Sequence, residues 1–135
     1  MEEQREKQRE EQRLRRVVIA DDSPAFLSAA ANYVTTLPGF QLAGVARTAP
    51  QAIDLVENSM PDVLLLDLRL APKRGELVRR VKSMAAAPAV VALSLFDTPE
   101  AAAAAKLAGA DDLVGKESFI AGLGRALARL FPGAA

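Results

Sequence analysis

Short aliphatic runs alternate along this chain with longer stretches of helical periodicity, and this alternation limits the fold more than any other feature. A short run without polar residues is typical of a strand buried on both faces. Such a strand needs helices above and below its sheet, because every side chain must be kept away from water. The alternation therefore predicts repeated strand–helix units around a parallel sheet.

Five strand–helix units can be traced from residue 16 onward. Strands are predicted at residues 16–20, 41–46, 62–66, 89–95 and 113–114, and helices at residues 24–37, 49–58, 75–84, 99–108 and 118–130. Ser23 and Thr48 precede helices as caps, and Gly109 follows one as a stop. Because crossover connections are right-handed, the predicted fold is α/β, a five-stranded doubly wound parallel sheet flanked by helices.

The chain has 135 residues, half of them apolar, which is enough for one well-packed domain. Residues 2–13 contain no aliphatic or aromatic side chain, so this segment cannot bury itself. Its acids and bases have helical i, i+4 spacing, which allows a solvated helix. We therefore expect a charged N-terminal tail at residues 1–15, one domain at residues 16–131 and a C-terminal tail at residues 132–135.

Composition excludes several kinds of chemistry. The chain has no cysteine and no histidine, so disulfides, thiolate or imidazole metal ligands and a histidine base cannot come from it. Lysine and arginine together number 17, as do aspartate and glutamate, so no net field attracts nucleic acid. No apolar run is long enough to span a bilayer. We expect a cytoplasmic protein without membrane contact, and no nucleic-acid binding through this chain alone.

Polar side chains stand at the ends of four predicted strands. They are Asp21 and Asp22 after the first, Asp67 after the third, Ser94 at the end of the fourth and Lys116 after the fifth. Each residue type is also common in loops and caps. The carboxyl ends of parallel strands meet at one edge of a sheet, however, and ligands bind there. Their joint placement therefore predicts a site.

Three carboxylates at one edge repel each other by about 1–4 kcal/mol per pair near 4 Å, depending on the effective dielectric. A divalent cation removes this repulsion. All the side chains available as ligands offer hard oxygen atoms, which favours Mg²⁺ and excludes zinc in practice. The sequence therefore predicts a magnesium site.

These residues identify a resemblance to a known family. The chain resembles the receiver domain of response regulators in two-component signalling, over residues 16–131. The resemblance rests on Asp21, Asp22, Asp67, Ser94, Lys116 and the stretch Ala-Gly-Ala-Asp-Asp at residues 108–112. It implies a flavodoxin-like fold similar to that of chemotaxis regulators, with strand order 2-1-3-4-5.

The resemblance also implies a role for each acid. Asp67 is the implied phosphoacceptor, which becomes an aspartyl phosphate. Asp22 and Asp67 are implied to hold Mg²⁺ directly, together with the backbone carbonyl of Arg69, while Asp21 acts through water. The chain is then a signalling phosphoprotein, and it is an enzyme only in catalysing its own phosphorylation and dephosphorylation.

The remaining polar positions and the partners follow from the same resemblance. Lys116 is implied to contact the phosphoryl charge, and Ser94 to donate the hydrogen bond that switches the domain. The implied donor is a histidine kinase or a phosphotransfer protein of a phosphorelay. The downstream protein is not identified by the sequence, and a homodimer is left open.

The chain departs from the family pattern at several positions. Ala71 followed by Pro72 replaces the proline usual four residues after the acceptor, and Leu113 replaces an aromatic residue that often takes part in switching. Glu117 stands where a proline often follows the lysine. The guanidinium of Arg69 could screen the site or contact the phosphoryl group, and simple exposure to solvent is the preferred interpretation.

Other functions remain as alternatives. The chain could be a receiver-like docking module that no longer accepts phosphate, or the excised receiver of a DNA-binding transcriptional regulator. A phosphatase of the haloacid-dehalogenase type needs an acid where Arg69 stands. Residues 109–116 resemble a phosphate-binding loop but have the wrong spacing, and Glu117 replaces the hydroxyl that such a loop needs.

Overall fold

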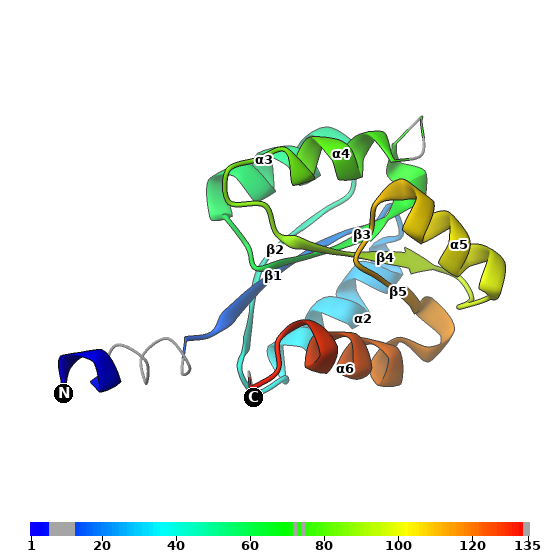
Figure 1. Cartoon of the computed structure of the whole chain (residues 1–135). Helices are drawn as coiled ribbons and strands as arrows, with labels where there is room; N and C mark the ends of the chain where they lie inside the picture. Colours follow the sequence, from blue (N-terminus) through cyan, green and yellow to red (C-terminus); the bar gives the residue numbers. More distant parts are fainter. Residues whose placement is uncertain (6–12, 72, 74, 134–135) are drawn as a thin grey trace.

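Five parallel strands form one sheet in the order β2-β1-β3-β4-β5, seen near its edge in Figure 1. The computed structural model describes residues 1–5, 13–71, 73 and 75–133. The strands are β1 (Arg15–Ala20), β2 (Phe40–Ala46), β3 (Val63–Asp67), β4 (Ala89–Ser94) and β5 (Asp112–Gly115). This is the predicted fold and the implied strand order, so both are confirmed.

Four helices connect the strands and a fifth follows β5, and all five lie within two residues of the predicted bounds. They are α2 (Pro24–Thr35), α3 (Ala49–Ser59), α4 (Glu76–Lys82), α5 (Pro99–Ala108) and α6 (Phe119–Leu130). Two 3₁₀ helices, η1 (Leu68–Leu70) and η2 (Lys116–Ser118), have no counterpart in the prediction. A helix of three residues is too short to produce a periodic pattern in the sequence.

Local capping explains where the helices begin and end. The hydroxyls of Ser23, Thr48 and Thr98 accept hydrogen bonds from backbone N–H groups in the first turns of α2, α3 and α5. A proline lies in the first turn of each of these helices. Gly109 ends α5 in the left-handed conformation, which glycine adopts without a steric penalty. The predicted caps at Ser23 and Thr48 and the stop at Gly109 are confirmed.

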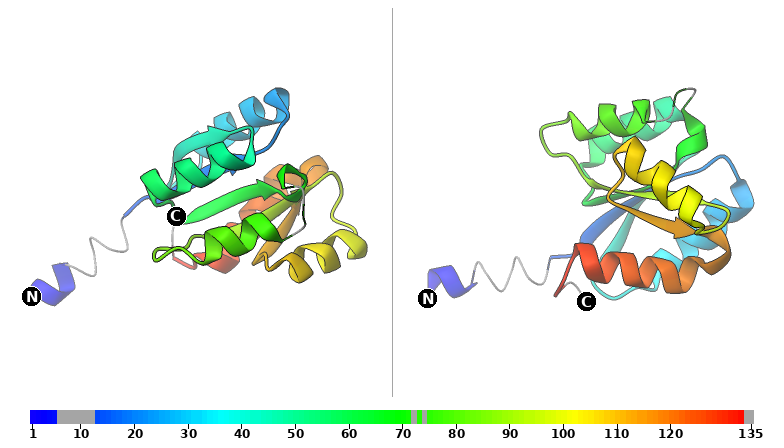
Figure 2. Two further views of the ribbon diagram at one scale, coloured as in Figure 1. Left: turned by 90° about the horizontal axis from the view of Figure 1, so that it is seen from above. Right: turned by 45° about the vertical axis from the view of Figure 1, so that its right-hand side comes forward.

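The sheet lies between two layers of helices (Figures 1 and 2), and each of its faces carries an apolar core. Helices α2 and α6 cover one face, and α3 and α4 cover the other. In β1, Val17 and Ile19 join the first core while Val18 and Ala20 join the second. Strand β3 alternates in the same way, so its apolar side chains are buried on both faces. The aliphatic runs of β1 and β3 are therefore buried on both faces of the sheet, as their composition predicts.

The N-terminal segment is described only in part. Residues 2–5 are helical, whereas every predicted i, i+4 ion pair includes a residue in the range 6–12, outside the described part of the chain. Arg13 donates hydrogen bonds of 2.9 and 3.2 Å to Asp62, which links this segment to the start of β3.

Within the described residues, no helix is both long enough and apolar enough to cross a bilayer.

Gly115 at the end of β5 provides a test of how tightly the loop between β4 and α5 is packed. A Cβ atom at this position would lie 2.9 Å from the backbone nitrogen of Asp97. We expect Gly115→Ala to lower the free energy of unfolding by about 1–3 kcal/mol, because backbone must move. Gly124 in α6 has nothing within 4 Å of such an atom. Gly124→Ala should raise the free energy of unfolding by about 0.5–1 kcal/mol.

Urea denaturation followed by circular dichroism measures both variants against the original chain. Similar effects of the two substitutions would contradict the close approach at Gly115.

Candidate functional site

Three carboxylates meet at the carboxyl edge of the sheet. Asp67 is the last residue of β3, and Asp21 and Asp22 directly follow β1, its neighbour in the sheet. One oxygen from each of the three side chains lies within 4.8 Å of the others. Asp21 and Asp67 are buried, at 0% and 2% exposure, while Asp22 is exposed. The structure therefore brings together the acids that the sequence places at strand ends.

The loops that carry the buried acids are shaped by the acids themselves. Oδ1 of Asp21 accepts a hydrogen bond of 2.9 Å from the backbone N–H of Ser23. Oδ1 of Asp67 accepts one of 2.9 Å from the backbone N–H of Arg69. An aspartate that bonds the backbone two residues later forms a turn of its own. Each carboxylate is thereby fixed in place, and its Oδ2 atom is left to face the site.

Lys116 bridges the two buried acids from the start of η2. Its ammonium forms an ion pair with Oδ2 of Asp21 and lies 3.2 Å from Oδ2 of Asp67. It also lies 4.9 Å from the centre of the Phe26 ring, a distance at which the ring attracts a cation. Phe26 is supported by an edge-on contact with Phe119 at 5.2 Å. The lysine side chain is only 12% exposed, so it is confined by these contacts.

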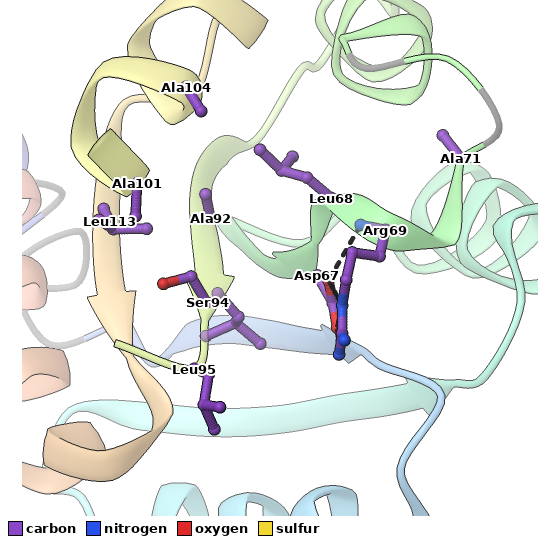
Figure 3. Close-up of a pocket in the computed structure, with 11 residues that line it drawn as sticks. Asp67, Leu68, Arg69, Ala71, Ala92, Ser94, Leu95, Ala101, Ala104 and Leu113 are labelled. Carbon is purple, nitrogen blue, oxygen red and sulfur yellow. Dashed lines mark hydrogen bonds and ion pairs between the residues drawn. The ribbon is translucent and has the colours of Figure 1, made fainter. Parts of the chain in front are cut away.

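Arg69 corrects the interpretation made from the sequence. Its guanidinium does reach solvent, at 77% exposure, but it also binds Asp67. Nε lies 3.2 Å from both carboxylate oxygens, and Nη2 lies 2.8 Å from Oδ2. Figure 3 shows the side chain folded back over the acid. The cause is the tight turn of η1, which brings Arg69, two residues after Asp67, back to the carboxylate. The sequence pattern does not reveal this turn.

The charge state of Asp67 follows from these contacts. Burial by itself raises the pKa of Asp67. The hydrogen bonds from the Arg69 guanidinium and backbone, together with the charges of Lys116 and Arg69, outweigh that effect and hold its pKa below the ordinary value. Asp67 is therefore an ionised carboxylate at neutral pH, which is the form that can act as a nucleophile or bind a cation.

Ser94 lies at the end of β4, but its hydroxyl is directed away from Asp67 (Figure 3). It donates a hydrogen bond to the backbone carbonyl of Phe96, in the following loop. A cavity of about 510 Å³ lies beside Asp67, lined by Ser94, Leu113 and several alanines. Leu113, which stands in the place of the family's aromatic residue, thus borders this cavity. Pro72, another noted departure, lies outside the described residues.

The acidic cluster suits a magnesium ion. Its donors are hard oxygen atoms, which Mg²⁺ prefers. Among the described residues, the contact that Oδ2 of Asp21 makes is its ion pair with the Lys116 ammonium. Asp22 is open to solvent and can approach an ion that keeps several waters. The participation of the Arg69 backbone carbonyl stays a prediction.

The structure also places residues that the sequence did not indicate. Phe26 and Phe119 form the wall beside Lys116. The sequence places Phe26 in the first turn of the helix that follows β1. Nothing in the neighbouring sequence indicates that its ring faces a cation.

Comparison with known proteins agrees with the geometry. The family model of the response regulator receiver domain matches residues 17–127. Protein-glutamate methylesterase/protein-glutamine glutaminase 5 of Myxococcus xanthus is 37% identical over 108 residues, which are 78% of this chain and 31% of that protein. A second such protein, from Anaeromyxobacter dehalogenans, is 34% identical over 81% of this chain and 32% of its own length. The chain thus spans less than a third of the length of these relatives.

Solved structures give the same result. A two-component response regulator of the LuxR family from Aurantimonas has a TM-score of 0.75 at 27% identity, over 87% of this chain and 85% of that one. CheY6 of R. sphaeroides, in complex with the P1 domain of CheA3, has a TM-score of 0.77 at 25% identity, over 87% of this chain and 97% of the matched chain. The strand order, the acidic edge and the family match together show that the chain belongs to the response-regulator receiver domain family.

Proposed function

We propose that this receiver accepts a phosphoryl group on Asp67 and changes its affinity for a partner protein as a result. The observation that carries the proposal is the convergence of Asp67 with Asp21, Asp22 and Lys116 at one edge of the sheet. Phosphoryl transfer needs mainly positioned groups and neutralised charge, and these residues supply both.

The transfer can be written with its bonds balanced. An oxygen of the ionised Asp67 carboxylate attacks the phosphorus atom of a phosphohistidine, so that an O–P bond forms as the P–N bond breaks. The leaving imidazole keeps the electron pair and takes up a proton. The chain itself contains no histidine, so the phosphohistidine must belong to a partner, a histidine kinase or a phosphotransfer protein. A small acyl phosphate can replace it, with a carboxylate as the leaving group.

Lys116 supplies the fixed positive charge in this proposal. Its ammonium already lies between the two buried acids, and the Phe26 ring holds it from the other side. A phosphoryl group on Oδ2 of Asp67 therefore comes within reach of the ammonium without movement of the main chain. Asp22 and Asp67, with Asp21 acting through water, would hold Mg²⁺, which would neutralise charge on the phosphoryl oxygens.

Ser94 is the proposed switch. Its hydroxyl donates to the Phe96 carbonyl, so it can donate to a phosphoryl oxygen only by giving up that bond. The loop that follows carries Leu95 and Phe96, which are 60% and 51% exposed. Loss of the bond frees this loop to take a second arrangement, which changes an apolar surface that a partner can contact.

The partners and the output of this receiver are proposed only in part from the similar proteins. CheY6 was solved with the P1 domain of CheA3, which makes a phosphotransfer domain the model for the donor here. The methylesterase and glutaminase activities named for several relatives are not part of this proposal, because the chain matches less than a third of those proteins. The downstream partner is proposed only as a protein that distinguishes the two states.

Treatment with acetyl phosphate tests the acceptor directly. We expect incubation with acetyl phosphate and Mg²⁺ to add one phosphoryl group, detected by intact mass, because Asp67 is ionised and held beside Lys116. Asp67→Asn should show no adduct, whereas the matched control Asp54→Asn, on the exposed face of α3, should react like the original chain. An equal adduct on Asp67→Asn would contradict the proposal, and no adduct on any variant would favour a docking module.

The lowered pKa of Asp67 predicts a dependence of stability on pH. The pKa of the Asp67 carboxyl is about 3.9 in the unfolded chain and lower in the folded one. The stabilisation is therefore complete above the unfolded pKa and is lost as the pH falls through the folded pKa. Between about pH 5 and about pH 3, the original chain should lose more free energy of unfolding than Asp67→Asn.

Urea denaturation at a series of pH values measures this difference. Parallel pH profiles for the two proteins would show that the folded environment does not favour the ionised form of Asp67.

A further inference from the structure

We propose that the guanidinium of Arg69 is an internal cation that competes with Mg²⁺ for the oxygens of Asp67, so that it must swing away when the metal binds. Arg69 would then set the Mg²⁺ concentration at which the acceptor site fills. This inference rests on the proposed function and concerns the regulation of the same site.

The carboxylate of Asp67 is already surrounded by donors. Oδ1 receives the backbone N–H of Arg69 at 2.9 Å and its Nε at 3.2 Å. Oδ2 receives Nε at 3.2 Å and Nη2 at 2.8 Å, and the Lys116 ammonium lies 3.2 Å away. A carboxylate has about four lone-pair positions, shared between its two oxygens. A metal ion that coordinates Asp67 must therefore replace at least one of these donors.

Only one of the donors is free to leave. The backbone N–H of Arg69 is fixed by the turn of η1, whose first residue follows Asp67 directly. Lys116 is 12% exposed and is held by Asp21 and by the Phe26 ring. The Arg69 side chain is 77% exposed, so its movement into water removes little packing. The guanidinium is thus the group that an incoming ion displaces.

The charges around Arg69 show that it lies in the field of the whole acidic cluster. The pKa of Arg69 is raised first by its hydrogen bond to Asp67 and by the negative charge of Asp67. The charges of Asp22 and Asp21 raise it further. These are the acids that meet within 4.8 Å as a candidate metal site. A guanidinium and a divalent cation in one small site repel each other strongly. Binding of the ion and retention of the Arg69 contact are therefore opposed.

The strength of the competition is limited by the exposure of Arg69. An ion pair open to solvent contributes modestly, although a forked guanidinium contact is stronger than a single one. We expect removal of the guanidinium to tighten Mg²⁺ binding about threefold to tenfold. A larger change would require a buried contact, which the structure does not have.

Magnesium titration of the full chain tests the competition without any phosphoryl donor. The dissociation constant is measured at constant ionic strength from the amide NMR shifts of Asp21 and Asp22, for the original chain and for Arg69→Gln. Arg80→Gln is the matched control, because it removes an exposed guanidinium that pairs with Glu57 outside the site. We expect tighter binding by Arg69→Gln and no change for Arg80→Gln.

The side chain of Arg69 gives a second, direct readout. Its Nε–Hε resonance, assigned by its absence from the spectrum of Arg69→Gln, reports the hydrogen bond to Asp67. We expect this resonance to move toward the position of a solvated arginine as Mg²⁺ is added, with the same midpoint as the amides of Asp21 and Asp22. This readout separates displacement from a general effect of charge, which would alter affinity without moving the side chain.

The outcomes distinguish this inference from the function on which it rests. If Mg²⁺ shifts the amides of Asp21 and Asp22 while the Arg69 resonance stays fixed, competition is wrong and the acceptor site stands. Equal or weaker binding by Arg69→Gln also overturns the inference. If no variant binds Mg²⁺, the metal site of the proposed function fails together with it.

Discussion

The structure of the site depends on one electrostatic constraint, the repulsion among carboxylates gathered at the carboxyl edge of the sheet. Asp21 and Asp67 are both buried, where repulsion between ionised groups is weakly screened. Lys116 contacts both acids, and Arg69 adds a second cation to Asp67 alone. The charges of Lys116 and Arg69 favour the ionised form of the buried Asp67. Asp67 and its neutralising groups thus form one unit.

The backbone makes this unit possible. Strands β1 and β3 are adjacent and parallel in register, with Ala20 opposite Leu66, so the residues that follow them emerge side by side. Strand β5 lies farther along the same edge, yet the turn of η2 directs Lys116 back toward β1 and β3. The hydrogen bond from the Glu117 N–H to the Leu95 carbonyl joins this turn to the loop after β4. The turn that carries Lys116 is therefore joined by a hydrogen bond to the loop that Ser94 also contacts.

Much of this arrangement could be predicted from the sequence, and particular residues show where prediction ends. The run before Asp67 is buried on both faces, so its pattern specifies a central strand, and parallel topology then fixes which edge the acid occupies. Serine and threonine caps fix the helix starts because their hydrogen bonds are local. Arg69 was misjudged because its direction depends on a three-residue turn. The irregular register between β1 and β2 near Gly44 and the ring of Phe26 beside Lys116 were also missed, since both depend on contacts between distant segments.

Exposure divides the site into buried groups and exposed groups, and this division supports the proposed use of the site as a switch. Asp21, Asp67 and Lys116 are held by backbone hydrogen bonds, an aromatic wall and burial, so their positions change little when charge arrives. Asp22, Arg69 and the loop of Leu95 and Phe96 are exposed, so their movement would displace little packed surface. In the proposed function, a change of charge on Asp67 acts first on buried neighbours and then on these exposed groups. A small chemical event at a buried carboxylate can in this way alter the surface that another protein contacts.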